Sequence, residues 1–388
     1  MTLTRQPAGA DNKKKCGSME AQPYLTNAWY VAAWSTEISR AMLERTILEQ
    51  SIVLFRKENG EAVAIGNACA HRYAPLSLGK LVGDTVQCPY HGLRYDSGGR
   101  CVHNPHADGT IPPRMAVPSY PLVERHGMIW LWFGAAENAD PAAIPDFSCH
   151  TDPELAFVGG IIEMKANYQL ITDNLLDLAH GEFVHEGVLS SEAITRSKLE
   201  TIQQGTTIYS NRWMPNGAAI PAFAMIFEDH VPGESVDQWA YMRWDAPAHM
   251  LLDVGITKLG APRGSGAWIY GTDILTPKDR FTTYYFWGIT RAYKIADPAA
   301  GELWRQVIKQ AFEGQDQVVI EAQQRLLGNR ELDDVRPVMF ASDAAAIRAR
   351  KQLARLIRDN AVPTPENPNL AGLRTNAGMT RSPVLPAV

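Results

Sequence analysis

The chain has 388 residues, of which 45% are apolar and 20% are charged, so it is long enough for two globular domains with sizeable cores. Its formal net charge is −5, and no stripe of lysine and arginine with interleaved aromatic residues occurs, which argues against nucleic-acid binding. No apolar run reaches the roughly 18 residues that span a membrane, the N-terminus lacks the apolar core of a secretory signal, and five cysteines make no disulfide framework. We therefore expect a cytoplasmic protein that binds neither nucleic acid nor membrane.

The first part of the chain has the sequence pattern of an all-β domain. Residues 1–20 are polar and lack hydrophobic periodicity, so we expect a flexible N-terminal extension. Beyond them, short apolar runs at 52–55, 62–65, 121–123 and 128–133 are separated by turn residues, which is typical of β-strands. The proline-punctuated stretch 140–145 reads as a linker. Residues 21–145 are thus predicted to form one β domain.

The pattern changes after this linker. Apolar residues recur at helical spacing across 168–186, and further helices are predicted at 302–327 and at about 342–358. Residues 200–290 return to strand-like runs. We therefore expect an α+β domain over 146–360. Residues 361–388 are rich in proline, glycine and asparagine and predict a flexible C-terminal tail.

Two cysteine–histidine pairs stand out within the predicted β domain. Cys69 and His71 form Cys-x-His and, after sixteen residues, Cys88 and His91 form Cys-x-x-His. Two thiolates and two imidazoles fit a tetrahedral zinc site or a Rieske [2Fe–2S] centre, in which two histidines replace two cysteines on one iron. Zinc fingers usually pair cysteine with cysteine and histidine with histidine, whereas the two types alternate here. The spacing favours the Rieske centre, with each loop giving one ligand to each iron.

The predicted helix 168–186 carries a second group of potential ligands. His185 lies five residues after His180, about 140° further around a regular helix, so the helix must loosen or end between them, and Gly181 would permit this. Asp316 lies on the apolar stripe of the predicted helix 302–327, where an unpaired carboxylate would be costly and needs a cation. Two histidines and one carboxylate match the facial triad that leaves positions for O₂ on Fe(II). The alternatives are an ordinary polar helix face and a local cap or ion pair for Asp316.

These motifs resemble those of the Rieske-type non-haem iron oxygenases. The resemblance covers about residues 25–355. It rests on the two cysteine–histidine pairs, on the segment that begins at Asp316, and on the iron motif Asn174-x-x-Asp177-x-x-His180 with His185 beyond it. It is greatest for the branch that includes dicamba O-demethylase, vanillate O-demethylase and toluenesulfonate methyl-monooxygenase. It implies an α+β protein with an N-terminal all-β Rieske [2Fe–2S] domain followed by a helix-grip-like α+β catalytic domain.

The resemblance also implies cofactors and partners. The expected ligands are Cys69, His71, Cys88 and His91 for the [2Fe–2S] cluster and His180, His185 and Asp316 for Fe(II). Electrons would come from NAD(P)H through a separate reductase and ferredoxin, and O₂ would be the oxidant. Three chains would form a head-to-tail homotrimer in which the cluster of one chain meets the iron of the next. Asp177, as an acceptor-only carboxylate, would bridge a histidine of each centre, and Asn174 belongs to the same catalytic motif.

The implied reaction is oxidation of a C–H bond in a small aromatic substrate. The leading expectation is a monooxygenase that carries out oxidative O- or N-dealkylation, such as demethylation, of an aromatic ether, amine or anilide, including xenobiotics and herbicides. The alternatives are hydroxylation of a methyl or ring carbon without dealkylation, and a non-catalytic Rieske electron carrier.

Two further aspartates are expected to contact the substrate. Asp245 and Asp273 resemble the positions at which a demethylase of this branch holds an anionic aromatic acid with asparagine and histidine. Two carboxylates would repel such an anion, so we expect a neutral aromatic substrate, or one that offers N–H or O–H donors. Structural hydrogen bonds by both aspartates are the alternative.

Overall fold

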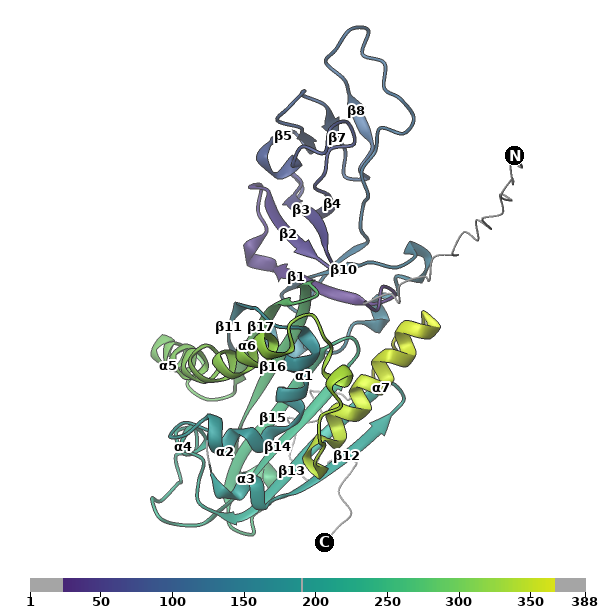
Figure 1. The fold of residues 1–388 in the computed structure, drawn as a ribbon. Helices are drawn as coiled ribbons and strands as arrows, with labels where there is room; N and C mark the ends of the chain where they lie inside the picture. The colour runs from purple at the N-terminus through teal and green to yellow at the C-terminus, as the bar shows by residue number, and fades with distance from the viewer. Residues whose placement is uncertain (1–23, 190, 367–388) are drawn as a thin grey trace, which may run out of the picture.

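The computed structural model describes residues 24–189 and 191–366 (Figure 1). The predicted N-terminal extension and residues 367–388 of the predicted tail lie outside the described residues. Figure 1 shows a β region that projects upward and a larger α+β region below it. Among the described helices, none has the length and apolar character needed to cross a membrane.

The β region consists of small antiparallel sheets. Their strands, in spatial order, are β1 (Trp29–Trp34), β10 (Met128–Trp132) and β9 (Leu122–Arg125); β2 (Leu43–Ile47), β3 (Gln50–Arg56) and β4 (Ala62–Gly66); and β5 (Lys80–Val82), β6 (Thr85–Gln87), β7 (Arg94–Tyr95) and β8 (Cys101–His103). The strands predicted from the apolar runs coincide with or overlap β3, β4, β9 and β10, so the all-β prediction is confirmed.

The side chains of β3 alternate between two hydrophobic cores. Successive side chains of a strand point to opposite faces. Ile52 and Leu54 pack into the large core shared with the α+β region, whereas Val53 and Phe55 pack around the two cysteines of the predicted cluster. One strand thus connects the cluster loops to the body of the protein.

The α+β region is built on one seven-stranded antiparallel sheet. Its strands lie in the order β11 (Ala156–Met164), β17 (Thr282–Arg291), β16 (Ala267–Asp279), β15 (His249–Lys258), β14 (Val236–Asp245), β13 (Thr207–Gly217) and β12 (Lys198–Gln204). Strand β14, next to the central strand β15, is buried along its whole length, because both faces of the sheet are covered there. This confirms the predicted strand-rich stretch between residues 200 and 290.

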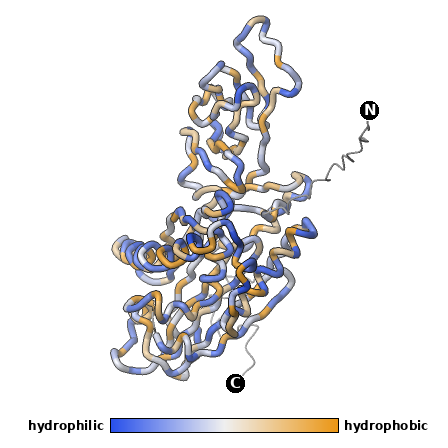
Figure 2. Tube along the Cα trace, viewed as in Figure 1, coloured by the Kyte–Doolittle hydropathy of each residue, from blue (hydrophilic) through white to orange (hydrophobic). Residues whose placement is uncertain are grey.

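Helices cover one face of this sheet (Figure 1). They are α1 (Tyr168–Leu176), α2 (Gly181–Val184), α3 (Glu192–Arg196), α4 (Pro221–Ala224), α5 (Pro298–Ile308), α6 (Gln317–Leu327) and α7 (Ala344–Asp359). Helix α1 buries Leu170, Ile171 and Leu175 in the large core. Apolar and polar residues interleave along the strands and along α5 and α6, as expected for elements with one face in the core (Figure 2).

Two of the predicted helices contain irregular segments. The helix predicted over 168–186 ends at Leu176, and after Asp177 the chain continues as a 3₁₀ turn (Leu178–His180) and the short α2. The break therefore lies at Asp177, and the prediction that Gly181 loosens the helix is wrong, since Gly181 has helical φ and ψ of −57° and −29°. The helix predicted over 302–327 is continuous, but its middle is a π-helix (Lys309–Asp316) between α5 and α6.

Hydrogen bonds join the two regions. The imidazole of His249 on β15 contacts the carbonyl of Trp29 on β1 at 2.9 Å, and the hydroxyl of Thr276 donates to the carbonyl of Val31 at 2.7 Å. The separate sheets support, as a proposal, the division into domains at residues 21–145 and 146–360.

Candidate active site

Two hairpin-like loops bring the four predicted cluster ligands together. In the first loop the amide of Tyr73 donates to the carbonyl of Cys69 at 2.8 Å, and in the second the amide of Gly92 donates to the carbonyl of Cys88 at 3.1 Å. The cysteines are buried (1% exposed each), whereas the imidazoles of His71 and His91 lie nearer the surface with ring centroids 4.5 Å apart. Two buried thiols and two imidazoles nearer the surface fit the ligand set of a Rieske centre.

Tyr95 is a neighbour of these loops that the sequence analysis missed. Its hydroxyl lies 3.2 Å from the sulfur of Cys69, and its side chain is fully buried. Hydrogen bonds to cluster sulfurs help to set the reduction potential. Tyr95 ends β7 two residues after Leu93, which is also buried, so strand alternation was the available signal.

The second predicted metal site converges in the α+β region. The Nε2 atoms of His180 and His185 are 3.2 Å apart, and they lie 3.5 and 3.3 Å from the two carboxylate oxygens of Asp316. Three donors at right angles and about 2.1 Å from one ion would be about 3.0 Å apart, so these separations suit a single metal ion. The ligand atoms of these three residues all lie within 4.8 Å of one another.

Further contacts orient this triad. The Nδ1 atom of His180 contacts the main-chain carbonyl of Asp177 at 2.6 Å, and the Nδ1 atom of His185 contacts Oε1 of Gln315 at 2.9 Å. Each imidazole therefore keeps its Nε2 atom for a metal. The side-chain amide of Asn174 donates to Asp316 at 3.2 Å, which places this predicted catalytic residue beside the triad. Gln315 was not found from the sequence, because its contact joins segments 130 residues apart.

The predicted bridging residue Asp177 contacts His180 differently from expectation. Within this chain its main-chain carbonyl, rather than its carboxylate, meets the imidazole. The carboxylate accepts a hydrogen bond from the amide of Ala179 at 3.1 Å and lies 3.6 Å from the guanidinium of Arg212. The Asp177 side chain is 26% exposed, so part of it faces outward.

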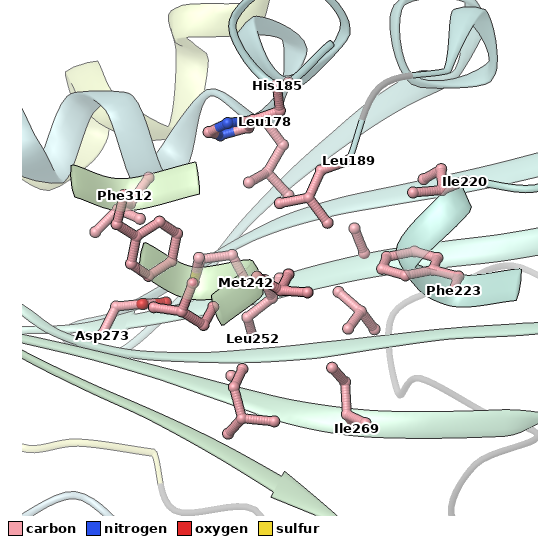
Figure 3. Close-up of a pocket in the computed structure, with 18 of the residues that line it drawn as sticks. Leu178, His185, Leu189, Ile220, Phe223, Met242, Leu252, Ile269, Asp273 and Phe312 are labelled. Atoms are coloured by element: carbon pink, nitrogen blue, oxygen red, sulfur yellow. The ribbon is translucent and has the colours of Figure 1, made fainter. Parts of the chain in front are cut away.

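A cavity of about 120 Å³ lies between the helices and the sheet, and the triad forms part of its wall. An apolar cavity of about 150 Å³ holds benzene, so this space is suited to a single aromatic ring. Most of the lining is apolar, including Leu178, Leu189, Ile220, Phe223, Met242 and Phe312. Figure 3 shows His185 at the edge of the cavity and Phe223 at the end remote from Asp273.

Asp273 is a carboxylate of this wall outside the triad. The hydroxyl of Tyr285 donates to it at 2.6 Å, and the ring of Tyr285 stacks on that of Phe312. Burial raises the pKa of Asp273 to about 7; the Tyr285 hydrogen bond lowers it, and the charge of Asp316 raises it further. Asp273 and Phe312 both line the cavity (Figure 3). The position supports the prediction that Asp273 contacts a substrate.

Asp245 does not line the cavity. Strand alternation points Met242 and Trp244 toward the helices and turns Asp245 to the opposite face of the sheet. There it pairs with the guanidinium of Arg243 at 2.9 Å and accepts a hydrogen bond from Thr207. This geometry contradicts the predicted substrate contact and matches the structural alternative, so we leave Asp245 out of the proposed site.

Comparisons with known proteins agree with this architecture. The Rieske [2Fe-2S] domain model matches residues 28–121, and the model of the vanillate O-demethylase oxygenase C-terminal domain matches residues 164–359. The oxygenase component of dicamba O-demethylase from Stenotrophomonas maltophilia is 39% identical over 86% of this chain and 98% of its own length. The oxygenase component of chloroacetanilide N-alkylformylase from Rhizorhabdus wittichii is 35% identical over 86% and 96%.

The fold is also shared with a solved structure. Dicamba monooxygenase bound to 3,6-dichlorosalicylic acid superposes with a TM-score of 0.82 at 38% identity, covering 86% of this chain and 98% of that one. The match extends over both the β region and the α+β region.

Proposed function

The chain belongs to the Rieske non-haem iron oxygenases, as an oxygenase component with a catalytic domain of the vanillate O-demethylase type, and from this premise we propose that it dealkylates the oxygen or nitrogen of a small, neutral aromatic substrate. The observation that carries the proposal is the triad of His180, His185 and Asp316 on the wall of an apolar cavity of single-ring size. The names of two relatives, an O-demethylase and an N-alkylformylase, support both dealkylations.

The two proposed cofactors would be bound in different regions of the chain, the cluster in the β region and the iron in the α+β region. Cys69, His71, Cys88 and His91 would hold the [2Fe–2S] cluster. His180, His185 and Asp316 would hold the iron, which, when bound, supplies the activation of O₂ and the insertion of one oxygen atom into a C–H bond, with electrons from NAD(P)H through a reductase and ferredoxin. Hydroxylation of a carbon attached to oxygen or nitrogen gives a hemiacetal or hemiaminal, which collapses to an aldehyde and a phenol or amine.

The residues of the cavity define the expected substrate. Its apolar wall binds an aromatic ring and excludes water from the reacting carbon. Asp273, held by Tyr285, is the polar anchor. An ionised Asp273 accepts a hydrogen bond from a substrate N–H or O–H and repels a carboxylate, so neutral phenols, anilides or amines fit better than benzoate-type acids.

A homotrimer is part of the proposal. The cluster loops, next to β5 and β7, lie at the far end of the β region from α2 and the triad (Figure 1). Within one chain the two centres are therefore remote, and a neighbouring chain has to bring its cluster to this iron. The outer surface of the cluster loops carries two exposed aromatic side chains, Tyr73 (82%) and Tyr90 (65%), that such a contact would cover. Asp177 would then bridge an iron histidine and a cluster histidine.

A cytoplasmic location also belongs to the proposal. Cys101 and Cys149 are unpaired, buried thiols, as is usual in a reducing compartment. NAD(P)H, the proposed electron source, would be available there.

The test combines metal analysis with a substrate screen. The purified chain, supplied with ferredoxin, reductase and NAD(P)H, would be offered methoxyphenols, methoxybenzoates and N-alkyl anilides, with detection of the released aldehyde. We expect about three irons per chain and aldehyde formation from neutral substrates. About two irons and no O₂-dependent product would instead indicate an electron carrier, and hydroxylated products without aldehyde would indicate a hydroxylase.

A further inference from the structure

Arg212 is a buried cation that the proposed chemistry has not yet used. It lies on β13, is 3% exposed and lines the cavity. A guanidinium stays protonated in proteins, and burial of a charge is costly unless it is paired. The environment of Arg212 therefore has to supply a compensating charge.

Asp177 supplies that charge. The Nη2 atom of Arg212 lies 3.6 Å from Oδ1 of Asp177, and among the described residues Asp177 is the one carboxylate found to act on it. Burial lowers the pKa of Arg212, and the charge of Asp177 raises it. The other end of the guanidinium is anchored, since Nη1 donates to the carbonyl of Ile194 and to the hydroxyl of Ser197, each at 3.3 Å. Arg212 is thus a fixed positive charge on the inner side of the Asp177 carboxylate.

Asp177 itself connects three parts of the site. Its carbonyl holds His180, its Oδ1 atom is shared between the Ala179 amide and Arg212, and its side chain is partly exposed. Asp177 is the non-helical residue that follows the end of α1, with φ of −104° and ψ of 82°. The direction of its carboxylate therefore depends on these contacts. Without Arg212, one amide hydrogen bond would be the main restraint on its inner oxygen.

We propose that Arg212 is a positioning residue, which holds the Asp177 carboxylate turned so that its outer oxygen can accept a hydrogen bond from a cluster histidine of the neighbouring chain. The inference rests on the bridging role proposed for Asp177. A guanidinium anchored at both ends fixes the direction of a carboxylate, whereas water in its place would not. The residue would therefore govern electron transfer between the two centres without touching the substrate-binding carboxylate or the iron ligands.

The test measures electron transfer directly in the metal-loaded trimer. Both centres are first oxidised, and one electron per chain is then added to the cluster without O₂ or organic substrate. Its passage to the mononuclear iron oxidises the cluster and reduces ferric iron to ferrous iron, which is followed by cluster absorbance and by the ferric paramagnetic resonance signal. The variants are Arg212→Gln, Arg212→Lys, Asp177→Asn and the double variant Arg212→Gln/Asp177→Asn. Arg348→Gln is the control, since it makes the same change at an arginine that donates to the carbonyl of Thr201.

The expected pattern is non-additive, because the two residues act as one unit. Arg212→Gln should slow electron transfer by at least about tenfold, the double variant should be no slower than Asp177→Asn alone, and Arg212→Lys, which keeps the charge, should recover to within about threefold of the parent. Arg348→Gln should transfer at nearly the parent rate. Iron content and melting temperature should stay close to those of the parent protein.

The possible failures are distinguishable. A parent-like rate in Asp177→Asn would remove the proposed bridge itself. A slow Asp177→Asn with a parent-like Arg212→Gln, or a double variant slower by the product of the two effects, would overturn the role of Arg212 alone. Should Arg212→Gln lose its metals, the metal-loaded Arg212→Lys variant decides: a rate within about threefold of the parent supports the role of the charge, and a slower rate overturns it.

Discussion

At the scale of single residues, two aspartates of the same sheet show how orientation decides a role. Asp245 is the last residue of β14, and Asp273 lies within β16. Both are almost fully buried. Asp245 faces a guanidinium, which neutralises it, whereas Asp273 faces the cavity and a tyrosine hydroxyl. An ion-paired carboxylate contributes to packing, and a carboxylate on a cavity wall selects ligands.

Replacing Asp273 should change which ligands the cavity accepts. At pH 8 or above, where Asp273 is ionised, Asp273→Asn keeps the size and an acceptor for Tyr285 but removes the negative charge, so benzoate should bind about tenfold more tightly, or about 1.4 kcal/mol, while a phenol loses affinity. Calorimetric titration of the iron-loaded protein with benzoate and with phenol measures both. Asp245→Asn is the control and should leave the ratio of the two affinities unchanged. An unaltered ratio in Asp273→Asn would remove Asp273 from the binding site.

At the scale of elements, irregular helix segments build the proposed iron site. A regular helix through residue 185 would turn His180 and His185 away from each other. The break at Asp177 and the 3₁₀ turn allow the two Nε2 atoms to approach within 3.2 Å. On the opposite side, the π-helix ends at Asp316, so that consecutive residues Gln315 and Asp316 both reach the histidines. π-helical turns frequently mark functional sites, because they shift side chains out of the regular helical phase.

The π-helix should therefore contribute to iron affinity through Gln315. Gln315→Ala removes the acceptor on Nδ1 of His185 and should weaken iron binding by about 10- to 100-fold, while the cluster remains bound. Iron retained during titration with a chelator, compared with the cluster absorbance, measures the two centres separately. Gln317→Ala is the matched control, since Gln317 bonds Glu321 rather than a triad residue. Equal iron retention in both variants would contradict the assignment.

At the scale of the whole molecule, buried neutral histidines lie where the two regions meet. His249 contacts the carbonyl of Trp29 across the junction, and His150 contacts the hydroxyl of Thr272 at 2.9 Å. Burial lowers the pKa of His249 to about 4 and that of His150 to about 3. Both therefore remain neutral in the folded protein at a pH where they are protonated in the unfolded chain.

Acid should destabilise the protein through these histidines. Their folded pKa values lie below the unfolded value of about 6.5, so the unfolded state binds more protons, and stability is complete above pH 6.5 and falls as the pH approaches 4. At pH 5 the loss is about 2 kcal/mol for each histidine. The melting temperature between pH 7 and pH 5 measures it. His249→Gln, which cannot titrate, should show a smaller decrease; an unchanged decrease would assign the effect to other groups.

The local motifs were readable from the sequence because their geometry is local. Cys69, His71, Cys88 and His91 lie within 23 residues, and each pair sits on a single loop, so spacing alone indicated how they converge. The strand and helix patterns likewise follow from periodicity, which the solvent and the core impose on each element separately. The expectation that Asp316 needs a cation followed from its place on an apolar stripe.

The tertiary structure decided what depends on long-range packing. It shows that the helix breaks at Asp177 and that Asp245 points away from the cavity. It also shows that Arg212 pairs with Asp177, which lies 35 residues before it in the chain. None of these can be obtained from spacing, because a strand has two faces and only the packing of the sheet determines which one meets the helices. The sequence by itself indicated the chemistry of the two proposed metal centres, and the fold decided which neighbouring side chains orient their ligands.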